Sequence, residues 1–333
     1  MLDLNGQKMT YFGGTSYLGM ASLPEFQDIL FNQIKQWGTA YGSSRNANVQ
    51  LAIYDEAEKA FAKYIGAEDV ICVSSGMLAG QLVLATLRDE NSVFFHHPQA
   101  HPAIVVAGSN PLFIGDHLHQ ELCKSGHQSI VICVDSMPAM HTTAVDLSFL
   151  KKIHPDKEIT LVIDESHALG LVGSAGGGIY AEIPAGILSR KIAVSSLGKA
   201  LGLAGGMIGA TKAFTATIRA SAQFVSASGA NPAYLGAFLK ASHLYAQQRS
   251  ILAGHLAYID LHLKPSAQIA FDKAYPVLYC KESTLADVLY THGIVITKFK
   301  YPTYPSEMLR IVISAHHHKE DIEKLINIVN SYT

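Results

Sequence analysis

Apolar and polar positions follow two alternating periodicities between about residues 50 and 230. Apolar residues recur every three or four positions over residues 55–64 and 77–87, which predicts two amphipathic helices. Short apolar runs bounded by glycine or polar residues predict strands at residues 69–74, 92–95, 129–134, 159–163, 191–194 and 206–210. Strands that alternate with helices are typical of an α/β fold with a doubly wound, mostly parallel sheet.

The pattern changes after Asn231-Pro232. A long helical pattern covers residues 234–263, and shorter elements follow it: strands at 274–280, 294–299 and 308–313 and a final amphipathic helix at 319–329. Because single cores stop growing at roughly 250 to 300 residues, a chain of 333 residues is expected to form more than one unit. We expect an N-terminal segment at 1–42, a large domain at 43–232 and a smaller C-terminal α/β domain at 233–333.

Composition narrows the class of protein. The chain is 49% apolar and carries 25 basic and 27 acidic residues, for a net charge of −2, so no electrostatic footprint for nucleic acid or an anionic membrane is expected. No apolar run approaches the roughly 20 residues that cross a bilayer. The four cysteines have neither CxxC spacing nor the density of a disulfide framework, and the N-terminus lacks a charged-then-apolar signal, which together favour the cytoplasm.

Polar residues that directly follow the expected strands are the candidates for chemistry, because open α/β sheets bind ligands beyond the carboxyl ends of their strands. At residues 74–77 a serine pair precedes a helix start, where free N–H groups could hold a phosphate or simply be capped. The other three strand ends are residues 96–101, 164–167 and 195–199.

Lys199, Asp164 and His167 at two of these ends are the residue types that hold pyridoxal phosphate. A lysine amine forms the Schiff base, and a buried carboxylate keeps the pyridine nitrogen protonated so that the ring can accept electrons. The histidine can bond the ring oxygen, and His101 could stack on a planar ring. We therefore expect a pyridoxal-phosphate site.

Other readings of these motifs are less well supported. A metal site is one alternative, because three histidines fall within residues 96–101 and a histidine triplet lies at 316–318. No partner with ligand spacing accompanies them. A solvated loop is therefore favoured for the first cluster and a capped surface turn for the second. Ser196 and Lys199 fit the S-x-x-K pattern of serine acyl-enzymes without its companion motifs. Gly198-Lys199 resembles the end of a P-loop, but Ala200 replaces the required Ser or Thr.

The motifs, taken in order along nearly the whole chain, resemble the α-oxoamine synthases, which are fold-type I pyridoxal-phosphate enzymes. The resemblance runs through Tyr17-Leu18-Gly19, Gly42-Ser43-Ser44-Arg45, Ser74-Ser75-Gly76, His101, the run from Asp164 to Gly170, Leu197-Gly198-Lys199-Ala200 and Leu309-Arg310-Ile311. It implies a fold-type I transferase, pyridoxal phosphate as cofactor, and a homodimer that shares its active sites.

The resemblance also implies roles for individual residues. Lys199 resembles the Schiff-base lysine, Asp164 the partner of the pyridine nitrogen, and His167 the ligand of the ring oxygen. His101 resembles the stacked imidazole, and Arg310 the arginine that holds the amino-acid carboxylate. Further matches to cofactor or substrate positions are Ser75, Gly76 and Met77 at the phosphate, Ser196 also at the phosphate, Ser136 near the ring, Ser228 toward the phosphate of a partner subunit, and Ser16 at a second carboxylate contact.

The implied activity joins a small amino acid to an acyl thioester, with Lys199 removing the α-proton. Three departures from the family pattern keep alternatives open: Ser16 and Ala100 replace asparagines, and fewer residues precede Tyr17 than is typical, which leaves the use of acyl-CoA open. Transamination, with a retro-aldol variant, is the second hypothesis. A protein that binds the cofactor without turnover is the third.

Overall fold

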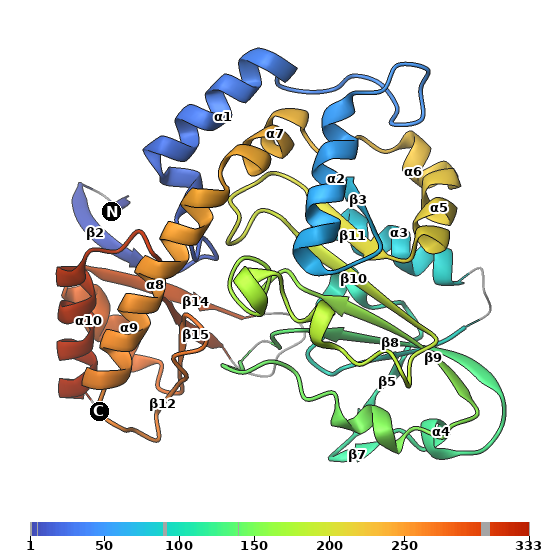
Figure 1. Cartoon of the computed structure of the whole chain (residues 1–333). Helices are drawn as coiled ribbons and strands as arrows, with labels where there is room; N and C mark the ends of the chain where they lie inside the picture. Colours follow the sequence, from blue (N-terminus) through green and yellow to red (C-terminus); the bar gives the residue numbers. More distant parts are fainter. Residues whose placement is uncertain (1, 5, 89–91, 139, 301–306, 333) are drawn as a thin grey trace.

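A seven-stranded sheet forms the centre of the protein, and a second sheet lies beside it (Figure 1). The computed structural model describes all residues except 1, 5, 89–91, 139, 301–306 and 333. In spatial order the large sheet consists of β3 (Asp69–Val73), β11 (Gly206–Ala210), β10 (Arg190–Ser196), β9 (Lys157–Asp164), β8 (Gln128–Asp135), β4 (Val93–His96) and β5 (Asn110–Pro111). Only β11 runs against the others, so the expected α/β fold with a mostly parallel sheet is confirmed.

The central strands of this sheet are buried on both faces. In β8, Val131 and Cys133 pack into a cluster with α3 and α5, while Ile130, Ile132 and Val134 pack into the main core. This explains why these strands have continuous apolar runs rather than alternation. The helices of the chain are α1 (Pro24–Trp37), α2 (Ala52–Ile65), α3 (Gly76–Arg88), α4 (Gln120–Cys123), α5 (Lys212–Ala220), α6 (Ala222–Ser226), α7 (Pro232–Lys240), α8 (Ser242–His262), α9 (Thr284–Thr291) and α10 (Lys319–Tyr332).

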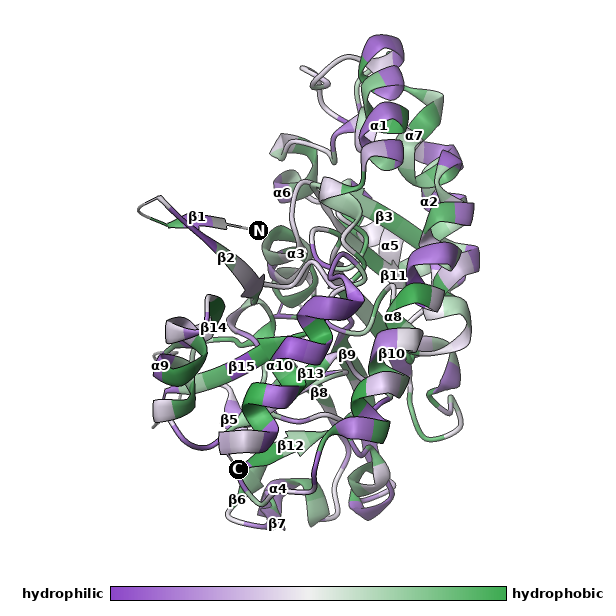
Figure 2. Cartoon of the chain, turned by 90° about the vertical axis from the view of Figure 1, so that its left-hand side faces the viewer, coloured by the Kyte–Doolittle hydropathy of each residue, from purple (hydrophilic) through white to green (hydrophobic). Residues whose placement is uncertain are grey.

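The second sheet combines strands from both ends of the chain. Its order is β1 (Leu2–Leu4), β2 (Gln7–Phe12), β14 (Ile294–Phe299), β15 (Met308–Val312), β13 (Val277–Cys280) and β12 (Ile269–Phe271). β2 pairs in parallel with β14, and the remaining pairs are antiparallel. Figure 2 shows β1 and β2 reaching out from the body as a hairpin. A further short hairpin joins β6 (Phe113–Ile114) to β7 (His117–Leu118).

The long helix expected at residues 234–263 is wrong as a single element, because the chain bends at Ala241 and forms α7 and α8. Ala241 is buried and has φ −102° and ψ 14°. α7 packs against α1 and α2, whereas α8 continues to α10 beside the second sheet (Figure 1). The helix axis therefore changes direction between α7 and α8, and apolar spacing alone does not reveal such a change.

The strand expected at 274–280 begins later, at Val277. The residues before it form a turn in which Asp272 Oδ1 accepts a hydrogen bond from the Ala274 N–H at 2.8 Å. Pro276 lacks the N–H that a strand ladder uses. This turn carries Tyr275, a residue of the candidate site described below.

Two class-level expectations concern membranes and disulfides. Within the described residues, no helix is both long enough and apolar enough to cross a membrane. The cysteines are free thiols: Cys72, Cys133 and Cys280 are buried, and Cys123 is exposed.

Candidate active site

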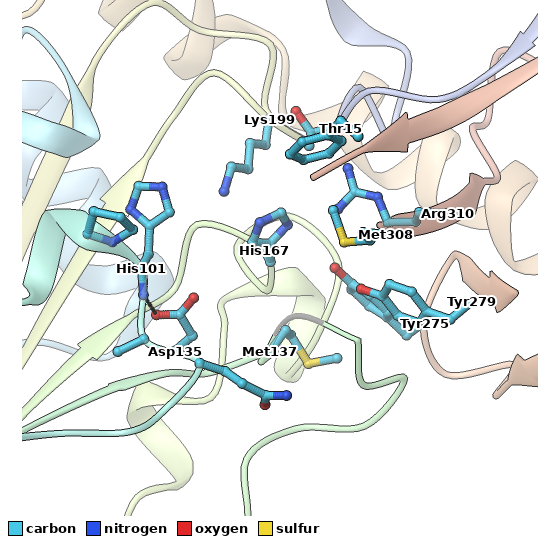
Figure 3. A pocket seen from close by; sticks show the side chains of 14 residues that line it. Thr15, His101, Asp135, Met137, His167, Lys199, Tyr275, Tyr279, Met308 and Arg310 are labelled. Atoms are coloured by element: carbon cyan, nitrogen blue, oxygen red, sulfur yellow. Dashed lines mark hydrogen bonds between the residues drawn. The ribbon is translucent and has the colours of Figure 1, made fainter. Parts of the chain in front are cut away.

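The carboxyl ends of β3, β10, β9, β8 and β4 meet at one edge of the large sheet, because these strands run in the same direction. A cavity of about 160 Å³ lies at this edge. Figure 3 shows His101, His167 and Lys199 on its large-sheet side, and Arg310, Tyr275 and Tyr279 facing them from the second sheet. Four predicted site residues, His101, His167, Lys199 and Arg310, therefore line one cavity.

Lys199 comes from the loop after β10, and its amine points into the cavity (Figure 3). Burial lowers the pKa of this amine, although the nearby carboxylates of Asp164 and Asp135 oppose the shift. Asp164 is the last residue of β9 and is 7% exposed, and its Oδ1 accepts the Ser166 N–H at 2.8 Å. The structure thus brings the predicted lysine and aspartate to neighbouring strand ends.

Asp135 is a further acidic residue of the site that our sequence analysis missed. It ends β8 directly opposite Asp164 in the parallel register, and its Oδ1 accepts the His101 N–H at 2.9 Å. Burial, and then the charge of Asp164, raise the pKa of Asp135 well above its usual value. The signal was present in the sequence, because Asp135 follows an apolar strand run just as Asp164 does.

His101 stands at the start of a short 3-10 helix and caps it, since its Nδ1 accepts the Ala103 N–H at 3.2 Å. Burial lowers the pKa of His101; the carboxylate of Asp164 opposes this effect and the charge of Lys199 adds to it. The imidazole therefore lies in the cavity as a neutral ring, which suits a stacking partner for a planar ligand.

His167 follows Asp164 in the tight turn after β9. Its Nδ1 lies 2.8 Å from the hydroxyl of Tyr17, and that hydroxyl lies 3.1 Å from the hydroxyl of Tyr275. Burial lowers the pKa of His167 well below its usual value, and the cations Lys199 and Arg310 add to the shift. In the sequence, Tyr17 stands out only as part of a motif and Tyr275 not at all, because tyrosines beside apolar runs look like core residues.

The turn from β3 into α3 forms a tight cradle against the end of β10. A Cβ on Gly76 would lie 2.7 Å from the Ser196 nitrogen, and one on Gly206 would lie 2.2 Å from the Ser75 carbonyl oxygen. Ser75 Oγ accepts the Leu78 N–H at 3.1 Å and so caps α3. Free N–H groups at a helix start, reached through glycine backbone, fit a phosphate group.

The other members of the phosphate prediction differ in what they offer. Met77 is 43% exposed, so only its backbone N–H belongs to the cradle. Ser196 donates its N–H to Ser166 Oγ at 2.7 Å, and its own Oγ accepts the Gly198 N–H at 3.2 Å. The Ser196 hydroxyl keeps its proton for a further acceptor.

Arg310 lies in β15 and is 8% exposed. One of its terminal nitrogens, Nη2, donates to the Gly14 carbonyl at 2.9 Å, whereas the buried Nε has no hydrogen-bond partner among the described residues. A buried donor without a partner is costly and marks a position that a ligand acceptor can fill. Arg310 thus fits an anionic group in the cavity.

Asp164, Ser75, Gly76, Met77 and Ser196 do not themselves line the cavity, and three further predicted residues, Ser136, Ser16 and Ser228, also lie outside it. Ser136 is fully buried and donates its hydroxyl to the Asp164 carbonyl at 2.9 Å. Ser16 is exposed and lines a neighbouring pocket, while Thr15 lines the cavity instead. Ser228 is exposed, and the next residue, Gly229, bridges Val73 beside the phosphate cradle. Their roles remain predictions.

The histidines of the two sequence clusters, at residues 96–101 and 316–318, contact different partners. His96 Nδ1 bonds Ser109 Oγ at 2.7 Å, and His97 Nδ1 accepts the Gln99 N–H at 3.2 Å. His317 stacks on Phe12 with ring centroids 3.9 Å apart. Across the described ranges, no three His, Cys, Asp or Glu side chains are grouped in a way that could hold a metal ion.

Comparison with known proteins gives consistent matches over nearly the whole chain. The profile of the family described as "Aminotransferase class I and II" matches residues 8–329. The 8-amino-7-oxononanoate synthase of Petrotoga mobilis is 25% identical over 97% of this chain and 88% of that protein. The enzyme of the same name from a Marinomonas strain is 27% identical over 96% and 85% of the two chains.

Solved structures share the fold at lower identity. A Sphingomonas wittichii serine palmitoyltransferase has a TM-score of 0.81 and 17% identity, and the match covers 99% of this chain and 88% of that one. The 8-amino-7-oxononanoate synthase of Francisella tularensis has a TM-score of 0.71 and 21% identity, with 97% of both chains covered. At these identities the likeness establishes the fold and leaves the reaction to be argued from the site.

Proposed function

We propose that this chain, which belongs to the class I and II aminotransferase family, is an acyltransferase that joins a small amino acid to an acyl thioester. The protein is a fold-type I pyridoxal-phosphate enzyme of the α-oxoamine synthase group, as expected from its motifs. The observation that carries the proposal is the convergence of Lys199, His167 and Arg310 on one cavity, in a chain whose curated relatives are named 8-amino-7-oxononanoate synthase.

The residues at the cavity fit pyridoxal phosphate. Lys199 would hold the cofactor covalently, and the buried carboxylate of Asp164 beside it would pair with the pyridine nitrogen. The glycine cradle at Gly76 and the hydroxyl of Ser196 would hold the phosphate. When bound, the cofactor supplies an electron sink for negative charge at the amino acid's α-carbon.

The protein's own groups provide orientation and proton transfer. Arg310 would bind the carboxylate of the amino acid, using the Nε that has no protein partner among the described residues. Lys199 would accept the α-proton, and its burial supports this role, since a lowered pKa leaves more of the amine neutral near pH 7. Tyr279, Met137 and Met308 also line the cavity and would border a bound amino acid.

Release of free thiol tests the proposal. Purified protein loaded with pyridoxal phosphate is given alanine, glycine or serine together with acyl-CoA of several chain lengths, and coenzyme A is measured with a thiol reagent. We expect thiol release that needs both substrates and is absent in Lys199→Ala. If no pair releases thiol, the acyltransferase proposal fails. Amino transfer to a keto acid under the same conditions would replace it with transamination.

We also infer that the enzyme works in the cytoplasm as a homodimer. Ser228 supports the second point, because it is exposed although it adjoins the bridge between Gly229 and Val73 near the phosphate cradle, where a second copy could reach it. Light scattering of the eluted protein measures the assembly. A monomer that binds the cofactor fully would contradict the shared site.

A further inference from the structure

Two tyrosine hydroxyls lie in a row beside the Nδ1 of His167, and the second of these tyrosines, Tyr275, also lines the cavity. Tyr17 OH lies 2.8 Å from His167 Nδ1, and Tyr275 OH lies 3.1 Å from Tyr17 OH. Tyr17 is 0% exposed and does not line the cavity, so bulk water does not compete for its bond to His167. The three residues come from distant parts of the chain: the segment after β2, the turn before β13 and the turn after β9.

The direction of the protons along this row follows from the available acceptors. Tyr275 OH has no hydrogen-bond partner other than Tyr17 among the described residues, so the Tyr17 oxygen is the protein acceptor for its proton. Tyr17 then directs its own proton to His167 Nδ1. The opposite arrangement would make Nδ1 a donor and direct the Tyr275 proton out of the row, where no described residue accepts it.

The charge of the imidazole agrees with this direction. His167 is half-buried beside Lys199 and Arg310, and desolvation, with the charges of these two groups adding to it, lowers its pKa well below the usual value. A neutral imidazole carries one proton, and the partner of one ring nitrogen decides which nitrogen holds it. An accepting Nδ1 requires the proton on Nε2.

We propose that Tyr275 and Tyr17 are positioning residues that fix His167 as the tautomer with its proton on Nε2. His167 then offers the cavity a hydrogen-bond donor, which is the group that the ring oxygen of pyridoxal phosphate needs. The row also makes cofactor binding depend on Tyr17 and Tyr275, which lie in the segment after β2 and in the turn before β13. This inference requires only the cofactor, so it stands or falls separately from the use of an acyl thioester.

The tautomer is measured by nitrogen NMR on protein that carries ¹⁵N-labelled histidine and bound pyridoxal phosphate, with the resonances assigned by their loss in His167→Asn. We expect the proton on Nε2 and an Nδ1 signal shifted by an accepted hydrogen bond. Tyr17→Phe should move the Nδ1 signal to the position of a nitrogen without a partner. Tyr275→Phe should move it less in the same direction, because the Tyr17 hydroxyl loses the donor that polarises it.

The affinity for pyridoxal phosphate gives a second readout by equilibrium dialysis. Tyr17→Phe should weaken it about fivefold, the factor expected for one neutral hydrogen bond. Tyr180→Phe is the matched control: that tyrosine is 4% exposed and its hydroxyl bonds the Lys191 carbonyl at 3.3 Å, so the loss is similar but remote from His167. A proton on Nδ1 in the unmodified protein would overturn the proposal, and so would an Nδ1 signal that Tyr275→Phe and Tyr17→Phe leave unmoved.

Discussion

Asp135 and Asp164 are neighbouring carboxylates whose surroundings give them different chemistry. They face each other at the ends of β8 and β9. Asp135 accepts the backbone N–H of His101, and burial raises its pKa, so its neutral form is favoured. Two carboxylates this close do not both ionise easily. We infer that Asp135 acts mainly as a hydrogen-bond acceptor that holds the His101 loop, while Asp164 is the carboxylate proposed to pair with the pyridine nitrogen.

Substitution by asparagine should separate these two roles. The amide introduced by Asp135→Asn would keep an oxygen for the His101 N–H, so we expect this variant to lower the rate of thiol release by less than about tenfold. Asp164→Asn removes the charge expected to pair with the pyridine nitrogen and should lower the rate by about a hundredfold or more. Stopped-flow or steady-state thiol release measures both, with unchanged circular dichroism as the control. Equal losses in the two variants would contradict the division of roles.

The sequence predicted the site residues whose types are rare at strand ends and missed those that look like core. Lys199, His101 and His167 are polar residues after apolar runs, and they line the cavity. Tyr17 and Tyr275 take part in the same site through their hydroxyls, but their rings are buried like any core aromatic. Whether the hydroxyl of a buried tyrosine reaches a site depends on the tertiary fold, and apolar periodicity does not show this.

The start of α3 is the element on which the proposed binding of the phosphate depends. It approaches β10 and β11 so closely that Gly206 leaves no room for a side chain: an added Cβ would lie 2.2 Å from the Ser75 carbonyl oxygen. The turn must move if this space is filled. The cradle therefore needs glycine because of the close approach of backbone.

We expect Gly206→Ala to weaken the binding of pyridoxal phosphate more than about tenfold and to destabilise the fold by about 1 to 3 kcal/mol. Equilibrium dialysis and urea unfolding measure the two effects. Gly254→Ala is the control, because Gly254 lies within α8 with open space around it, and the change should stabilise the fold by about 0.5 to 1 kcal/mol. Unaltered cofactor affinity in Gly206→Ala would contradict this account of the cradle.

A buried carboxylate connects α2 to α5 and to the edge strand β3. Glu58 in α2 accepts hydrogen bonds from Arg45 Nη1 at 2.9 Å, Arg219 Nη2 at 2.9 Å and the Cys72 N–H at 2.8 Å. This gives Arg45 of the Gly42-Ser43-Ser44-Arg45 motif a structural contact that ties its loop to α2 and β3. The Arg45 side chain is only 7% exposed, so the carboxylate of Glu58, rather than water, compensates its positive charge.

Glu58→Gln should destabilise the protein by about 3 kcal/mol, because it leaves buried guanidinium charge without a carboxylate. The free energy of unfolding in urea measures this. Glu121→Gln removes a surface pair with Lys124, in which the glutamate side chain is 54% exposed, and should have no measurable effect. If both changes lower the free energy of unfolding equally, the Glu58 network stabilises the fold no more than a surface ion pair does.

At the scale of elements, apolar periodicity placed most strands of the large sheet within a residue or two. It joined α7 to α8 because both have helical spacing and no proline or glycine marks the bend at Ala241. It also gave no sign that β2 pairs with β14, since such a pairing joins residues far apart in the sequence. Local pattern predicts elements, and long-range packing decides how they combine.

At the scale of the whole molecule, His317 fastens the segment after β15 to β2. Its ring stacks on Phe12, its Nε2 donates to the Tyr11 carbonyl at 2.9 Å, and its Nδ1 accepts the Ser314 N–H at 3.0 Å. Protonation would turn Nδ1 into a donor that faces another donor. The contact therefore requires a neutral imidazole.

Stability should consequently fall in mild acid. Burial lowers the pKa of His317, and that of His97, from 6.5 to about 4. Between these two values the unfolded chain binds more protons than the folded one, so the free energy of unfolding decreases as pH falls from 6.5 toward 4, by at most about 3 kcal/mol for each histidine. Urea unfolding at several pH values measures the slope. His317→Gln should flatten it, and an unchanged slope in that variant would contradict the role of His317.

The pairing of β2 with β14 has a consequence for how the protein is made. Residues 7–12 leave the ribosome long before residues 294–299, so Met9 and Phe12, which are fully buried in the finished protein, have no sheet to join during most of synthesis. A chain whose translation pauses before β14 would expose them to chaperones. Because Arg310 lies in β15, which follows β14 in the chain, the candidate active site is completed only in the last stage of folding.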